Sequence, residues 1–155
     1  MSVGLEYRGF DELDKAFNKL LDSREGLRRK YHEQLADIAK EEVDRGINAT
    51  VNDRNGKVRG WQEKSVGSGG GYAAVRAQKG KTGKDSPGAI TNYLESGHKI
   101  RSPSGKAKQK RRRRVNVAYV NGRHFYRSAQ SSLDSKLLSI AREYADEIGS
   151  ILNGG

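Results

Sequence analysis

A run of bases in the last third of the chain is the feature best suited to binding. No Asp or Glu lies between Glu95 and Asp134, and this interval holds 11 of the 30 Lys and Arg residues. The remaining 19 bases equal the 19 acids, so the net charge of +11 comes from this interval alone. Its densest part could neutralise several phosphates and release their counterions, which makes binding steeply salt-dependent. We therefore name as contact candidates Lys106, Lys108, Lys110, Arg111, Arg112, Arg113 and Arg114.

The partner of this basic segment (residues 99–114) is left open by its composition. No Phe, Tyr or Trp occurs within it, so contact with nucleic acid would be to the backbone and would not read sequence. The same charges could dock on an acidic surface of a neighbouring protein. A solvated arm without a specific role is the third interpretation.

Residues with catalytic or metal-binding chemistry do not form a known pattern. The chain has no Cys, and its three His residues lack the companion spacing of a metal site. Glu95 precedes His98 by three positions, but Gly97 is expected to end the helix that such a pair needs, so a helix-end turn is the preferred interpretation. No nucleophile elbow, H-E-x-x-H motif or P-loop is present. We expect no enzyme, no cofactor and no metal, although an enzyme acting through Glu95 and His98 is a weaker alternative.

Helical periodicity is strongest at the two ends of the chain. Apolar residues at helical spacing predict a helix over residues 10–21, a second helix from the Asp22/Glu25 capping pattern to about Gly46, and a C-terminal helix over residues 125–151. Pro87 favours a short helix that ends at Gly97.

Strand signals occupy the middle of the chain. We predict strands over residues 58–66, 72–77 and 115–120, with flexible loops near residues 67–71, 78–86 and 99–114. Trp61, Tyr93 and Phe125 are the candidate core or interface anchors. The order of elements predicts an α+β fold, in which a small antiparallel sheet packs with a long N-terminal helix, a short middle helix and a long C-terminal helix.

Composition indicates one domain over residues 1–155 with a modest core. Hydrophobic residues make up 34% of the chain, below the roughly 45–50% of a compact globular protein. Assembly with other subunits is therefore a plausible source of further burial. The first residues do not resemble a secretory signal and no segment is apolar enough for a membrane span, so we expect a soluble protein made in a cytoplasm.

Several short phrases resemble a family of phage proteins. The opening Gly4-Leu5-Glu6-Tyr7 with Gly9-Phe10-Asp11-Glu12-Leu13, and the middle phrase Asn55-Gly56-Lys57-Val58-Arg59-Gly60-Trp61, are similar to segments of the tail-completion and head–tail connector proteins of tailed bacteriophages, the minor tail protein Z-like family. The phrases Tyr93-Leu94-Glu95-Ser96-Gly97-His98 and Val120-Asn121-Gly122-Arg123-His124-Phe125 also resemble this family.

The resemblance implies a structural protein of the virion neck, made in the host bacterial cytoplasm. It implies self-association in a ring, expected to be a hexamer, between the tail tube or tail terminator and the head-side connector. Non-specific contact with packaged DNA could accompany this role, and no membrane is involved. The alternative is a basic nucleic-acid-binding protein that acts through residues 106–114.

Overall fold

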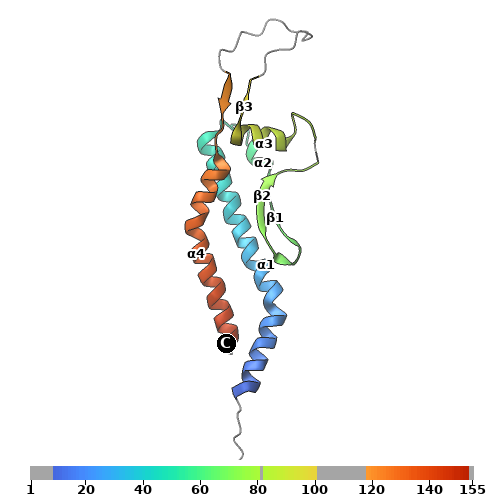
Figure 1. The fold of residues 1–155 in the computed structure, drawn as a ribbon, viewed down its shortest axis with the longest axis vertical. Helices are drawn as coiled ribbons and strands as arrows, with labels where there is room; N and C mark the ends of the chain where they lie inside the picture. The colour runs from blue at the N-terminus through green and yellow to red at the C-terminus, as the bar shows by residue number, and fades with distance from the viewer. Residues whose placement is uncertain (1–8, 81, 101–117, 154–155) are drawn as a thin grey trace, which may run out of the picture. The chain divides into compact units, whose positions relative to one another are not determined.

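Two long helices and a set of short elements between them make up the protein. The computed structural model describes residues 9–80, 82–100 and 118–153 (Figure 1). The long helices are α1 (Gly9–Thr50) and α4 (Phe125–Leu152). Between them lie α2 (Lys57–Gly60), β1 (Gln62–Val66), the 3-10 turn η1 (Ser68–Gly70), β2 (Ala73–Ala77), α3 (Pro87–Ser96), β3 (Gly97–Lys99) and β4 (Tyr119–Asn121).

The α+β fold predicted from the sequence is confirmed. Within the described ranges the strands form two small antiparallel sheets, β1 with β2 and β3 with β4, instead of one shared sheet. The described helices include none with the length and apolar composition that a membrane crossing requires. The chain divides into two compact units, the first comprising residues 1–39, 64–75 and 131–155 and the second residues 40–63 and 76–130.

In the first unit, α1 and α4 run antiparallel and make contact through tyrosine rings and one carboxylate (Figure 1). The ring of Tyr31 meets that of Tyr144 edge-on, with 5.1 Å between centroids. Glu147 accepts hydrogen bonds from the Tyr31 hydroxyl at 2.7 Å and from Lys30 Nζ at 2.6 Å. Leu27 and Tyr31 are buried on this face of α1. The two helices are therefore joined by apolar contact and by the two hydrogen bonds that Glu147 accepts.

The glycine-rich tip of the β1–β2 hairpin packs closely on α1 in the same unit. Gly67 N–H donates to the Tyr72 carbonyl at 2.9 Å and closes the tip, while Arg28 donates to the Gly69 carbonyl at 2.9 Å. A Cβ on Gly70, whose φ is +66°, would lie 2.7 Å from the backbone nitrogen of Arg29. Glycine is therefore needed at this position both for the turn and for the close approach.

The second unit has its core between the C-terminal part of α1 and the first turns of α4. Val43, Ile47, Phe125 and Ala129 are buried there, and Phe125 and Ile47 are fully enclosed. Gly46 permits this packing, since a Cβ on it would lie 3.0 Å from the Phe125 carbonyl oxygen. The core thus rests on close helix-to-helix contact.

Local signals correctly predicted three elements, namely the strand at 73–77 and the helices α3 and α4. Pro87 occupies the first turn of α3 as predicted, and Ser86, which was assigned to the preceding loop, caps the helix because its hydroxyl accepts the Ala89 N–H at 3.2 Å.

Two predicted boundaries are wrong. The expected break between two N-terminal helices near Asp22 does not occur, and α1 continues without interruption as 42 residues. Strong helix formers surround that position, and Ser23 bonds back to the Lys19 carbonyl at 2.8 Å instead of starting a new helix. Residues 58–60, predicted as the start of a strand, belong instead to the short helix α2. The predicted strand over residues 115–120 is described only from position 118 onward, and β4 begins at Tyr119.

Candidate functional site

The candidate site is the scaffold in the second unit that holds the residues on both sides of the segment 101–117, which contains most of the basic segment. β3 and β4 pair antiparallel, with Gly97 opposite Asn121, His98 opposite Val120 and Lys99 opposite Tyr119. The ladder continues one step further, because Ile100 N–H donates to the Ala118 carbonyl at 3.1 Å. The intervening residues 101–117 lie outside the described residues. They include every predicted partner or DNA contact, namely Lys106, Lys108, Lys110, Arg111, Arg112, Arg113 and Arg114, so their role stays a prediction.

The end of α3 is bonded directly to the start of α4. Arg123 N–H donates to the Leu94 carbonyl at 2.7 Å, and His124 N–H donates to the Glu95 carbonyl at 3.2 Å. The Glu95 carboxylate then accepts the backbone N–H of Tyr126 at 3.0 Å and of Arg127 at 3.2 Å. A carboxylate at these free N–H groups satisfies them and interacts favourably with the helix dipole. Glu95 is therefore the cap of α4.

Two glycines allow the connecting segments to touch. A Cβ on Gly97, whose φ is +78°, would lie 2.3 Å from the Val120 carbonyl oxygen. A Cβ on Gly122 would lie 2.2 Å from the Glu95 carbonyl oxygen. No side chain larger than hydrogen fits at either position without movement of the backbone, so the scaffold is closely packed at the end of the ladder where Gly97 pairs with Asn121.

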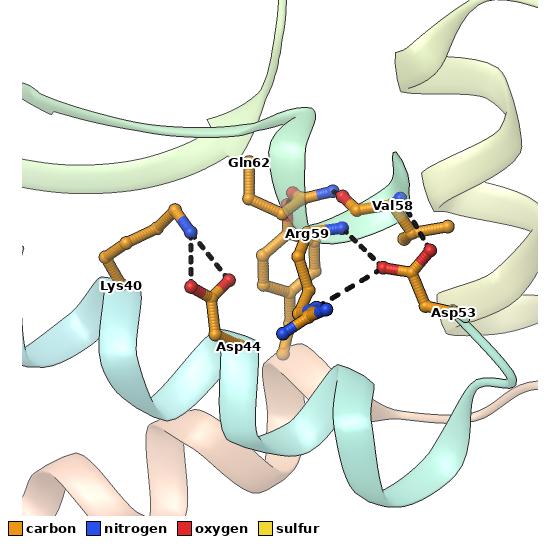
Figure 2. Close-up of polar contacts among 7 residues, drawn as sticks. Lys40, Asp44, Asp53, Val58, Arg59 and Gln62 are labelled. Atoms are coloured by element: carbon orange, nitrogen blue, oxygen red, sulfur yellow. Dashed lines mark hydrogen bonds and ion pairs between the residues drawn. The ribbon is translucent and has the colours of Figure 1, made fainter. Parts of the chain in front are cut away.

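A polar cluster around α2 also belongs to the second unit (Figure 2). The side-chain amide of Gln62, a residue only 2% exposed, donates to the Val58 carbonyl at 2.9 Å and to the Thr91 hydroxyl at 3.2 Å. Its carbonyl oxygen accepts the hydroxyl of Tyr126. Burial, with the charge of Glu95, raises the pKa of Tyr126 to about 12. Gln62 therefore links β1, α3 and α4.

Asp53 fixes the loop before α2, as Figure 2 also shows. Its carboxylate is 4% exposed and accepts the backbone N–H groups of Val58 at 3.1 Å and Arg59 at 3.0 Å. The Arg59 guanidinium Nε lies 3.5 Å from the same carboxylate. Burial acts to raise the pKa of Asp53, but the backbone donors and Arg59 outweigh it and hold that pKa below its ordinary value. The carboxylate therefore stays charged and keeps the turn closed.

The three predicted anchors have different environments. Phe125 is fully buried in the core, and its ring lies 4.8 Å from that of Tyr126. Trp61 is half-buried at the end of α2, with Lys57 Nζ 5.3 Å from its ring centroid. Tyr93 is 43% exposed, and its ring contacts that of His98 at 5.3 Å. Phe125 is thus a core residue, whereas Tyr93 is on the surface.

The contacts of Glu95, Gln62 and Asp53 position backbone and side-chain groups of the second unit. Glu95 caps a helix and the ring of His98 lies tilted against that of Tyr93, so the two residues considered as a catalytic pair have separate structural contacts. Across the described residues, no three His, Cys, Asp or Glu side chains gather closely enough to hold a metal ion.

Sequence reasoning missed Glu95 as a cap and Gln62 as a structural residue, and it placed Asp53 in a turn over residues 52–56 without assigning a contact to its carboxylate. Asp53 alone had a usable signal, an Asp in a turn just before a short helix. Comparison with protein-family models, with curated proteins and with solved structures gave no match for this chain.

Proposed function

We propose that the chain is a structural subunit of the neck of a tailed bacteriophage, where a ring of copies completes the tail and joins it to the head connector. The observation that carries this proposal is the pairing of two phrases that resemble the tail-completion family. Residues 93–98 and 120–125 are far apart in sequence, yet their backbones are bonded to one another through Leu94, Glu95, Gly97 and His98. A contact between the two phrases is expected if they are parts of one inherited scaffold.

The pairing of β3 with β4 supports the proposal, because it fixes the positions of the two residues that flank the segment 101–117. The two ends of the segment 101–117 leave and return side by side at Ile100 and Ala118. In the proposed ring, the basic segment contacts an adjacent ring, with contact to packaged DNA as a secondary role.

Deletion of the gene from its phage or prophage tests the proposal. Electron microscopy of the lysate should show filled heads accompanied by separate tails, and a plasmid copy of the wild-type chain should restore joined virions. A copy with Arg111, Arg112, Arg113 and Arg114 changed to Ser should fold but fail to restore them. Intact virions in normal number after deletion would refute the neck function.

Nucleic-acid binding through residues 106–114 is the second candidate. It is favoured by eight bases and no acid among residues 101–117. It predicts roughly micromolar binding of a DNA duplex at low salt, falling steeply as salt rises, and loss of that binding in the four-Ser variant. Fluorescence anisotropy of a labelled duplex measures the affinity of each chain and its dependence on salt. Salt-sensitive binding together with normal virions after gene deletion would favour this candidate over the neck function.

A further inference from the structure

The N-terminal part of α1 carries an apolar stripe that α4 does not cover. Antiparallel pairing sets Tyr31 beside Tyr144, and α4 continues only about two turns further, to Leu152. Figure 1 shows α1 extending past that end. Leu13, Phe17 and Leu21 are 44%, 47% and 56% exposed, and their spacing of four residues places them on one face of α1. We call residues 13–24 the overhang.

An amphipathic helical segment of this length needs a partner. The stability of a helix in a protein comes mostly from packing of its apolar face, and the large apolar side chains of the overhang are exposed. Three large apolar side chains in a row on a monomer surface are also unfavourable. The overhang therefore has the properties of a surface that is buried on assembly.

A matching surface lies on α4 in the same unit. Asp134, Leu138, Ala141 and Ala145 are exposed and follow each other at spacings of four and three residues, so they share one face of the helix. Leu138 is 63% exposed, the highest value among the large hydrophobic residues of this region, and Leu137 beside it is 39% exposed. The two alanines leave room for large side chains to approach the α4 backbone. The α4 face is thus complementary in size to Leu13 and Phe17.

Charge selects one direction of pairing. On the overhang, exposed Asp14 and Arg24 lie ten positions apart, about 15 Å along the helix, and on α4 exposed Asp134 and Arg142 lie about 12 Å apart. Antiparallel pairing sets Asp14 near Arg142 and Arg24 near Asp134. Parallel pairing would set acid near acid and base near base, which is unfavourable.

We propose that the overhang of one copy packs antiparallel on the exposed face of α4 of a second copy, with Phe17 over Ala141 and Leu13 over Ala145. The overhang and the α4 face are different surfaces, so the contact is heterologous. Each copy carries both surfaces and can bind one neighbour through each of them, as a ring requires. This inference depends on the proposed neck function for its biological setting, but its test uses the purified chain alone. Failure of the contact and failure of the neck function are therefore distinguishable.

Cysteine cross-linking tests the pairing directly, because the wild-type chain has no Cys. Phe17→Cys and Ala141→Cys are made in separate full-length chains, mixed and oxidised. Both positions are exposed, so folding should be retained, and circular dichroism checks this. The expected product is a disulfide between the two different variants, mapped by mass spectrometry. A disulfide between two Phe17→Cys chains, or no disulfide at the highest soluble concentration, would overturn the proposal.

Charge reversal gives a second, independent readout. Asp14→Arg and Arg142→Asp should each weaken self-association about fivefold, and the chain that carries both changes should recover most of the loss. Sedimentation velocity measures the dissociation constant. Phe17→Ser should weaken it roughly 30-fold through lost apolar burial. The control Lys15→Glu, on the opposite side of the overhang, should change it little. A wild-type monomer at all concentrations, or no recovery in the double variant, contradicts the pairing.

Discussion

The carboxylate of Glu95 accepts the backbone N–H of Tyr126 at 3.0 Å, and so caps a helix that begins 30 positions later in the chain. Its other oxygen accepts the Arg127 N–H at 3.2 Å. Caps are ordinarily supplied by the residue just before the helix. Here the cap comes from the end of α3, so the orientation of α4 depends on α3 and on the β3–β4 ladder that follows it.

Replacing Glu95 by Ala should destabilise the protein. The change leaves two helix N–H groups without their acceptor, and we expect the free energy of unfolding to fall by about 1–2 kcal/mol. Urea denaturation followed by circular dichroism measures this, and Glu95→Gln, which retains one acceptor oxygen, should lose less. Glu41→Ala is the matched control, because Glu41 is an exposed residue of the same unit. Equal stabilities for Glu95→Ala and Glu41→Ala would refute the capping role.

Ala substitutions at two glycines of the second unit should have opposite effects. Gly97→Ala places a methyl group 2.3 Å from the Val120 carbonyl oxygen at a φ of +78°, so the ladder must move and about 2 kcal/mol or more of stability should be lost. Gly88→Ala, within α3, meets nothing within 4 Å and should stabilise by about 0.5–1 kcal/mol. Thermal unfolding of both variants measures the difference. A Gly97→Ala variant as stable as wild type would contradict the close packing of the ladder.

Elements with local signals were predictable from the sequence. Pro87 and Gly97 predicted α3 because the residues that start and end a helix lie next to it in the chain. The Asp22/Glu25 pattern failed for a physical reason: a capping sequence permits a helix to start but does not end the helix that precedes it. Gly67 to Gly71 were interpreted as a flexible tip, yet Gly70 packs on the backbone of Arg29, a contact that no local pattern reveals.

The site itself was predictable only in part. Its ends could be located, because the basic interval and the glycines at positions 97 and 122 stand out in the sequence. Its internal bonds could not, since Gln62 and Tyr126 are 64 positions apart and Glu95 reaches Tyr126 across 31. Such contacts depend on which elements pack together, which residue spacing does not determine.

Tyr31→Phe should raise the pKa of Glu147. That pKa is held below its ordinary value, first by the hydrogen bond from Lys30 and second by the one from Tyr31, and the variant removes the second donor. Carboxyl NMR titration should show the rise, with a larger one in Lys30→Met. The same hydrogen bond raises the pKa of Tyr31 to about 12, so its contribution to stability is full below pH 10 and is lost as the pH rises toward 12.

Tyr144→Phe is the control for this prediction. It keeps both donors to Glu147 and retains the aromatic contact with Tyr31. An unchanged pKa of Glu147 in Tyr31→Phe would show that the 2.7 Å contact does not persist in solution.

Asp53→Asn should lower the free energy of unfolding at neutral pH. It should also make that free energy less dependent on pH in the acidic range. The folded protein holds the pKa of Asp53 below the ordinary 3.8, although burial alone would raise it. A carboxylate with a lowered pKa contributes stability that is full above its unfolded pKa and is lost as the pH falls through the folded pKa. At pH 7 the variant should lose about 1–3 kcal/mol, since an amide replaces a charged acceptor of two N–H groups.

The difference between wild type and Asp53→Asn should shrink as the pH is lowered. Below pH 4 the unfolded chain takes up a proton at Asp53 that the folded carboxylate resists, so unfolding is favoured and the wild-type chain approaches the stability of the variant. Urea denaturation at several values between pH 7 and pH 3 measures this. Asp85→Asn, an exposed residue just before the cap of α3, should leave stability at pH 7 unchanged. A gap between wild type and Asp53→Asn that stays constant over this range would show that the Asp53 carboxylate is not the group that closes the turn before α2.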